Sequence, residues 1–136
     1  MSDPAGDLGF PVVDLPPSAR ASPEAAVRFL VEWLVRSGRL QPGQADRVTR
    51  QVLRRESLGS TGIGRGIAVP HALSDAVGQV LGVAGRAAGP VAWPGAFDSV
   101  PVRVVYLLVM PASAPGESLR ALEAAVRKLR DGPADT

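Results

Sequence analysis

The chain has 136 residues, of which 46% are hydrophobic and 21% charged, so one folded globular domain is expected. Its net charge of +2 is too small to indicate nucleic-acid binding. It has no cysteine and a single histidine, which excludes disulfides and thiol catalysis and does not supply the usual zinc ligands, so we expect no metal and no cofactor. No apolar segment approaches the roughly 18–20 residues of a membrane span, and the N-terminus lacks the apolar run of a signal peptide, so we expect a cytoplasmic protein without membrane insertion.

The N-terminal part of the chain predicts a short strand and a helix. Residues 1–10 have no clear apolar pattern and are expected to form a flexible tail. Residues 11–15 (PVVDL) predict an edge strand, because proline is tolerated at a strand start. Ser22 is a suitable N-cap and Pro23 suits the first helical position, so a helix is expected from Pro23 until Gly38 stops it. The apolar stripe of this helix comprises Ala26, Val27, Leu30, Val31 and Leu34.

A second helix is expected from about residue 43 to residue 56. Its buried face is formed by Ala45, Val48, Val52 and Leu53. Arg47, Arg50 and Arg54 lie at i, i+3 and i+7 on another face of this helix. This arginine row is either a solvated helix surface or a docking patch. We favour the solvated surface, because charged helix faces are usually just solvated.

The second half of the chain predicts strands followed by a helix. Residues 67–69 and 79–85 are short strand candidates. Residues 101–110 (PVRVVYLLVM) are β-branched, aromatic and almost continuously apolar, which is typical of a central strand buried on both faces. A last helix is predicted from about residue 114 to residue 130, with an apolar stripe that comprises Leu119, Leu122, Val126 and Leu129.

The order of the predicted elements is strand, helix, helix, strand, strand, strand, helix. A strand that is buried on both faces needs helices on both sides of its sheet. We therefore predict an α/β fold, a single layered domain in which a mixed β-sheet has helices on both faces. The domain is expected to cover residues 11–130, with a tail at residues 131–136.

Residues 59–72 (GSTGIGRGIAVPHA) are rich in glycine and end near the single histidine. A P-loop needs lysine and then serine or threonine where this chain has Arg65 and Gly66. The dinucleotide-binding fingerprint needs a third glycine where this chain has Ile67, and both motifs need a preceding strand rather than a helix. These two kinds of nucleotide loop are therefore excluded.

Two interpretations of the glycine-rich stretch remain open. Glycine lets backbone amides face an anion, and the hydroxyl groups and flanking arginines here could hold a phosphoryl group. The stretch could equally be a flexible turn between a helix and a strand. Arg55 flanks the stretch on its N-terminal side, and the residues that would form a loop cradle are Ser60, Thr61, Gly62, Gly64 and Arg65.

His71 follows Pro70 at the end of the predicted strand at residues 67–69. A lone histidine is more often structural than catalytic. However, α/β folds place reactive groups at strand ends, and a neutral imidazole is a competent nucleophile near pH 7 because its ordinary pKa is about 6.5. His71 is therefore the candidate nucleophile, and the loop could supply donors for the charge of a phosphohistidine.

The run from Arg55 to Ala72, RESLGSTGIGRGIAVPHA, resembles the active-site signature of the enzyme IIA domains of the fructose/mannitol family in the bacterial phosphotransferase system. Its unbroken STGIG is most similar to the nitrogen-regulatory branch. The predicted helix pair, the segment at residues 98–101 and the run VRVVYLLVMP at residues 102–111 are compatible with this family. The resemblance covers about residues 10–130.

This resemblance implies a phosphocarrier or regulatory protein, a phosphohistidine component of the phosphotransferase system. HPr or its nitrogen-branch counterpart would donate a phosphoryl group to His71, and Arg55 would stabilise that group during transfer. His71 would then pass it to a transporter domain or signal to a regulatory target through its phosphorylation state. The family often has a second histidine where this chain has Ser118, and its members usually continue past the last predicted helix.

Two other functions fit parts of the sequence. A non-transferring interaction or sensor domain on the same fold would keep the loop and use it to bind a partner or an anion. A nucleic-acid-binding module would use the arginine row, but aromatic residues are only 4% of the chain and are not interleaved with it, so we expect no nucleic-acid partner. Phosphorylation of His71 would distinguish the phosphocarrier from the non-transferring domain.

Overall fold

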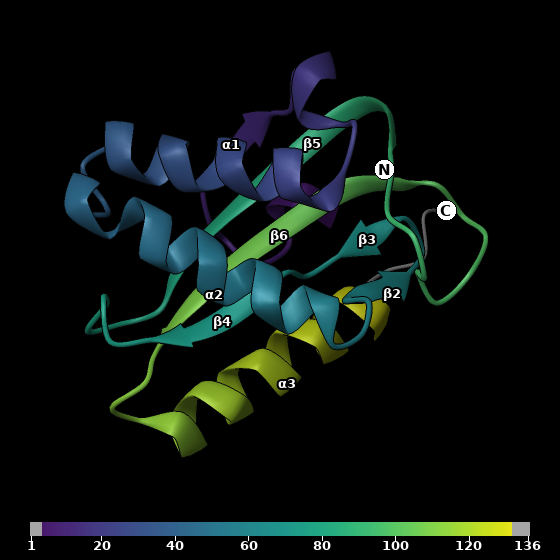
Figure 1. The fold of residues 1–136 in the computed structure, drawn as a ribbon. Coiled ribbons are helices and arrows are strands. Elements are labelled where there is room, and N and C mark those ends of the chain that lie inside the picture. The colour runs from purple at the N-terminus through teal and green to yellow at the C-terminus, as the bar shows by residue number, and fades with distance from the viewer. Residues whose placement is uncertain (1–3, 132–136) are drawn as a thin grey trace.

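A mixed β-sheet with helices on both faces forms the centre of the computed structural model, which describes residues 4–131 (Figure 1). Its strands are β1 (Val12–Asp14), β2 (Gly62–Gly64), β3 (Ile67–Ala68), β4 (His71–Ser74), β5 (Leu81–Val91) and β6 (Val102–Pro111). The α-helices are α1 (Pro23–Arg36), α2 (Ala45–Ser57) and α3 (Pro115–Asp131). Three single 3₁₀ turns are η1 (Pro4–Gly6), η2 (Pro17–Ala19) and η3 (Pro42–Gln44). The predicted α/β fold class is therefore confirmed.

Strand β6 is the central strand of the sheet. On one side it pairs antiparallel with β5, whose outer neighbour is the parallel strand β1. On the other side β6 pairs in parallel with β3 and then with β4, and β2 lies outside β3. Within the described residues, β4 pairs with β6 alone, so its other edge is open. His71, the first residue of β4, lies opposite Leu108 at this open edge.

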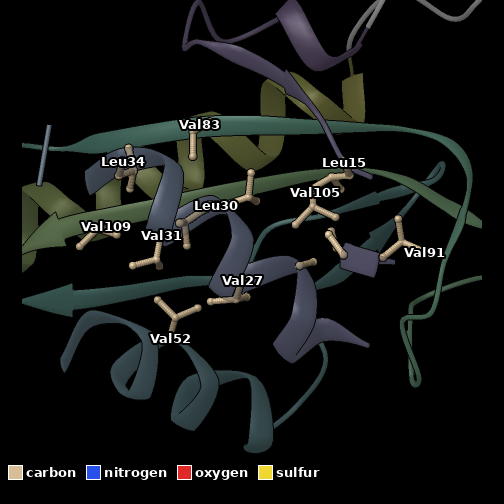
Figure 2. Close-up of a cluster of buried hydrophobic side chains, with 14 of the residues drawn as sticks. Leu15, Val27, Leu30, Val31, Leu34, Val52, Val83, Val91, Val105 and Val109 are labelled. Atoms are coloured by element: carbon tan, nitrogen blue, oxygen red, sulfur yellow. The ribbon is translucent and has the colours of Figure 1, made fainter. Parts of the chain in front are cut away.

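The side chains of β6 alternate between two buried clusters, as predicted for a strand covered on both faces. Val105, Leu107 and Val109 face the cluster that α1 and α2 close, and Figure 2 shows it with Val27, Leu30, Val31 and Val52 from these helices. The alternate residues Val104, Tyr106 and Leu108 face the second cluster. There they meet Ala5, Ile67, Val69, Ala84 and Leu129.

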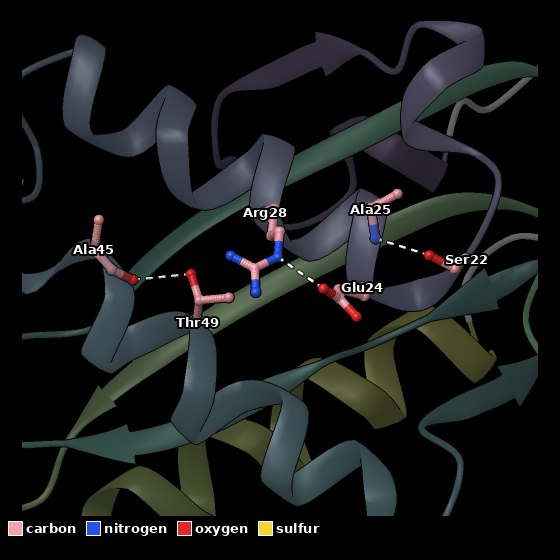
Figure 3. A network of polar contacts seen from close by, with 6 residues as sticks. All are labelled: Ser22, Glu24, Ala25, Arg28, Ala45 and Thr49. Atoms are coloured by element: carbon pink, nitrogen blue, oxygen red, sulfur yellow. Dashed lines mark hydrogen bonds and ion pairs between the residues drawn. The ribbon is translucent and has the colours of Figure 1, made fainter.

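The helix starts follow local capping chemistry. Ser22 Oγ accepts a hydrogen bond of 3.0 Å from the Ala25 N–H, which satisfies one of the free N–H groups in the first turn of α1 (Figure 3). Gly38, with φ of +79°, ends that helix as predicted. The second helix begins slightly later than expected, because Pro42–Gln44 form a 3₁₀ turn before it. Within residues 4–131 no helix is long and apolar enough to cross a membrane.

The predicted flexible tail is wrong for residues 4–10, which pack on the sheet. Ala5 is fully buried, and its carbonyl accepts a 2.7 Å hydrogen bond from the Tyr106 hydroxyl. The Phe10 ring lies so close to Gly82 that a Cβ there would stand 2.7 Å from it. These contacts are made with β5 and β6, so no local pattern at the N-terminus indicates them. Residues 1–3 and 132–136 of the predicted tails lie outside the described residues, and Asp131 is the last residue of α3.

Three strands differ from the prediction. The strand predicted at residues 79–85 runs instead from Leu81 to Val91, because pairing with β6 continues past its glycines. Strands β2 and β4 were not predicted, since each is at most four residues long and is defined by its neighbours. As a result His71 begins a strand rather than ending one.

Candidate functional site

The imidazole of His71 is held in one orientation by the backbone. Its Nδ1 lies 2.8 Å from the Val69 carbonyl oxygen. A carbonyl oxygen only accepts hydrogen bonds, so Nδ1 carries the proton, and Nε2 has the free lone pair when the ring is neutral. Within the described residues Nε2 has no hydrogen-bond partner. Nε2 is therefore the ring nitrogen with a lone pair available to a ligand.

The environment of His71 favours the neutral ring. Burial lowers the pKa of His71 below its ordinary value of 6.5. The hydrogen bond to Val69 opposes this shift, the Arg55 guanidinium lowers the pKa further, and the Glu56 carboxylate again opposes it. The net effect of these opposing influences is a lowered pKa of His71. The imidazole is therefore mostly neutral at pH 7, and its Nε2 is available as a nucleophile.

A cavity of about 550 Å³ opens in front of His71, lined by residues of α2, β4 and α3. Its polar lining consists of Gln51, Arg54, Arg55 and His71, and no carboxylate is among its lining residues. The remaining lining is apolar and comprises Leu58, Ala72, Leu73, Met110, Pro115, Leu119 and Leu122. An anion beside His71 would thus meet positive charge and no carboxylate among the lining residues.

Arg55 lies close enough to His71 to act on it electrostatically. It lies in the last turn of α2 and lines the same cavity. Its Nη1 donates a 2.9 Å hydrogen bond to the Gly59 carbonyl, which restrains the side chain. The guanidinium has further N–H groups that can donate to a phosphoryl oxygen.

Three residues of the predicted loop cradle, Ser60, Thr61 and Gly62, form hydrogen bonds within the stretch or with Glu56. The Thr61 N–H donates to Glu56 Oε2 at 3.0 Å, and the Thr61 hydroxyl donates to Glu56 Oε1. The Gly62 N–H donates to Ser60 Oγ at 3.1 Å. None of the three lines the cavity. Gly62 is needed for close packing, because a Cβ there would lie 2.6 Å from the Ala96 Cβ.

Arg65 and Gly66 form the turn between β2 and β3, directly after Gly64 at the end of β2. Gly64, Arg65 and Gly66 all have positive φ, at 93°, 60° and 78°. The Arg65 N–H donates to Asp98 Oδ2 at 3.0 Å, and its guanidinium donates to the carbonyls of Leu129 and Arg130 at the C-terminal end of α3. The cavity is lined by the N-terminal half of α3, so Arg65 points elsewhere. The structure thus places part of the glycine-rich stretch in a hairpin turn, and residues 60–65 are not among those that line the cavity in front of His71.

Ser118 is buried near the start of α3 and does not line the cavity. Its hydroxyl donates a 3.0 Å hydrogen bond to the Pro111 carbonyl. The side chain at this position therefore connects α3 to the end of β6. Among residues 4–131 no group of three or more His, Asp or Glu side chains could hold a metal ion.

Several cavity residues were not singled out as site residues from the sequence. Gln51, Arg54 and Leu58 line the cavity together with Arg55; Gln51 at i−4 and Leu58 at i+3 could have been identified from helical spacing, whereas Arg54, next to Arg55 in the chain, could not. Gln51 Oε1 is buried without a hydrogen-bond partner among the described residues. Leu119 was predicted to be buried but is 56% exposed, because it lies at the rim of the cavity.

Comparison with known proteins shows which family has this arrangement. The family model described as phosphoenolpyruvate-dependent sugar phosphotransferase system, EIIA 2, matches residues 14–133. The fructose-specific EIIA component of Haloferax volcanii is 32% identical over 109 residues, which are 80% of this chain and 69% of that protein. A nitrogen regulatory protein of Bradyrhizobium diazoefficiens is 37% identical over 90 residues, 65% of this chain and 58% of that protein.

Comparison with solved structures indicates the same family. The crystal structure of nitrogen regulatory protein IIA-Ntr from Neisseria meningitidis matches with a TM-score of 0.74 and 30% identity, over 92% of this chain and 81% of that one. The complex of enzyme IIAMTL and phosphorylated enzyme IIBMTL from Escherichia coli matches with a TM-score of 0.58 and 22% identity, over 90% of this chain and 93% of that one, which is a likeness of fold. The chain therefore belongs to the EIIA 2 family of the phosphoenolpyruvate-dependent sugar phosphotransferase system.

Proposed function

We propose that this protein is a cytoplasmic phosphocarrier or regulatory protein whose His71 accepts a phosphoryl group from a donor of the HPr type. The observation that carries this proposal is the hydrogen bond from His71 Nδ1 to the Val69 carbonyl, which leaves Nε2 as the nucleophile. Nε2 attacks phosphorus, a P–Nε2 bond forms, and the bond between phosphorus and the donor breaks. The electron pair of the broken bond leaves with the donor, and Nδ1 keeps its proton throughout.

Arg55 is proposed to neutralise the phosphoryl charge during transfer. Its guanidinium acts electrostatically on His71 and is restrained by the bond to Gly59, so it is already in place before the donor arrives. Phosphoryl transfer depends mainly on positioning and on stabilising negative charge, and both are supplied without rearrangement.

The phosphoryl group is proposed to have one of two fates. It is passed to a transporter domain, or it remains on His71 and signals to a regulatory partner. Support for the first comes from the solved complex with phosphorylated enzyme IIBMTL, and support for the second comes from the nitrogen regulatory relatives.

Intact-mass analysis tests the proposal. The protein is incubated with phosphoenolpyruvate, enzyme I and each of several HPr-type donors, and an acid-labile mass gain of one phosphoryl group is expected. His71→Ala is expected to abolish the gain, and Arg55→Ala to slow it while leaving the unfolding midpoint nearly unchanged. A gain that persists in His71→Ala would contradict the site, and an unchanged rate in Arg55→Ala would contradict the role of the arginine.

A non-transferring interaction domain is the second candidate function. The observation that favours it is Ser118, whose hydroxyl is bonded to the Pro111 carbonyl and so brings no second imidazole to the cavity from α3. On this hypothesis no donor phosphorylates the chain, although an HPr-type protein still binds it. The same mass experiment, together with a binding titration of unphosphorylated donor, distinguishes the two functions.

A further inference from the structure

The charge on the outer face of α2 beside the cavity is positive. Of the arginine row, Arg47 forms a 2.8 Å ion pair with Asp75. Arg50 and Arg54 are exposed and form no ion pair with a described residue. The carboxylate in the last turns of the helix, Glu56, is turned toward Thr61 and Trp93 and so does not face outward. Two cations on this face therefore form no ion pair with any residue among 4–131.

The opposite rim of the cavity is apolar. Leu73 on β4 is 45% exposed and Leu119 on α3 is 56% exposed, and both line the cavity. Leu58, just after α2, is 79% exposed and also lines it. Exposed large apolar side chains that gather around one opening are typical of a protein interaction surface.

The exposed part of α3 next to this rim adds no net charge. Its first two turns carry Glu117 and Arg120, which cancel. Asp75, just after β4, is already paired with Arg47. The surface around the cavity is thus asymmetric, apolar along β4 and α3 and basic along α2.

We propose that this docking surface, formed by Arg50, Arg54, Leu58, Leu73 and Leu119, selects a phosphoryl-donor protein whose contact face has an apolar centre and carboxylates on the side that meets α2. The inference rests on the proposed function, since a protein that delivers a phosphoryl group to His71 has to cover the mouth of the cavity. Opposite charges on the two faces accelerate encounter and disfavour donors with a basic face. Arg50 and Arg54, which the sequence analysis assigned to a solvated helix surface, would thereby determine which donor protein is selected.

The experiment compares two routes to the same phosphohistidine. Phosphoramidate is a small phosphoryl donor that needs no protein interface, and the HPr-type protein that labels the chain fastest is the second donor. The measured quantity is the ratio of the rate constant with the protein donor to that with phosphoramidate. Any direct effect of a substitution on His71 reactivity cancels in this ratio, and labelling by phosphoramidate also reports that a variant is folded.

Arg54→Glu is expected to lower the ratio roughly tenfold, and Arg50→Glu to lower it in the same direction. Added sodium chloride is expected to lower the ratio for the wild type and to have less effect in Arg54→Glu. The matched control is Arg36→Glu, the same charge reversal at the exposed end of α1, which should leave the ratio unchanged.

Two outcomes would count against this docking surface. If both donors label His71 and the ratio is unchanged or higher in Arg54→Glu and Arg50→Glu, the donor face is not acidic and the inference is overturned while the proposed function stands. If neither phosphoramidate nor any protein donor labels His71, the proposed function fails, and the inference fails with it.

Discussion

Glu56 connects the last turn of α2 to the hairpin and to the β5–β6 connection. Its Oε2 accepts from the Thr61 N–H at 3.0 Å and from Trp93 Nε1 at 3.1 Å, and its Oε1 accepts from the Thr61 hydroxyl. Thr61 and Trp93 are both buried. The three donors therefore depend on this carboxylate, and Glu56→Gln is an informative perturbation of the frame next to Arg55.

The expected loss in the free energy of unfolding depends on which hydrogen bonds of the Glu56 carboxylate a glutamine amide can still form. In Glu56→Gln the amide oxygen can take the place of Oε2 and accept both N–H bonds, and the amide NH₂ can donate to Thr61 Oγ. The substitution thus removes charge assistance from up to three bonds without removing the bonds themselves. Charge-assisted bonds contribute ~1.5–3 kcal/mol and neutral ones ~0.5–1.5 kcal/mol, so we expect a loss of about 2 kcal/mol in this half-buried position. Glu56→Ala leaves three donors without their acceptor and should lose about 3–4 kcal/mol.

Urea unfolding followed by far-UV circular dichroism measures this loss. Glu24→Gln is the matched control, because Glu24 also accepts a short bond, 2.9 Å from Arg28, but both side chains are more than half exposed (Figure 3). An exposed pair of this kind should change the free energy of unfolding by less than about 0.5 kcal/mol. If Glu56→Gln is no more destabilising than Glu24→Gln, the reasoning about Glu56 is refuted.

Three further outcomes are expected. Gly62→Ala should destabilise the protein by roughly 1–3 kcal/mol, because the new Cβ would lie 2.6 Å from the Ala96 Cβ. The control Gly59→Ala, with no atom within 4 Å of the new Cβ, should have little effect, and equal unfolding midpoints of the two variants would contradict the steric argument. Ser118→Ala should lose about 1 kcal/mol with the rate of His71 phosphorylation unchanged, and a slower rate would show that the hydroxyl acts in transfer. The NMR titration of His71 should give a pKa below 6.5. The folded state then binds fewer protons than the unfolded state, so the free energy of unfolding should fall as the pH drops from 6.5 toward the folded pKa. The variant His71→Gln should remove that part of the pH dependence.

The helices and strands that were predicted correctly are those defined by residues close together in the sequence. The capping serine and the terminal glycine define α1, and the apolar run of residues 102–110 is long enough to identify a strand covered on both faces. Strands β2 and β4 were missed because their pairing partners, β3 and β6, determine them. The packing of residues 4–10 was missed for the same reason, since it depends on Tyr106, which lies 101 positions from Ala5.

The candidate site was predicted in part. His71 and Arg55 line one cavity, as the resemblance implied. The glycine-rich stretch was ambiguous because glycine serves an anion-binding loop and a tight hairpin equally well. Two contacts that shape this stretch are non-local: Asp98 accepts from the Arg65 N–H, and Ala96 leaves no room for a side chain at residue 62. Neither contact has a signal within the stretch.

The interruption between β3 and β4 accounts for the reactive nitrogen of His71. Ile67 lies opposite Val104 and His71 opposite Leu108, so the two strands keep one register along β6 and form a single strand broken at residues 69–70. At this break the Val69 carbonyl accepts from His71 Nδ1. The ring is thereby fixed by its own strand, with Nε2 left over at an open sheet edge that a second protein can approach. A side chain from another element is not required to orient the imidazole, which is why Ser118 can hold α3 to β6 without removing the nucleophile.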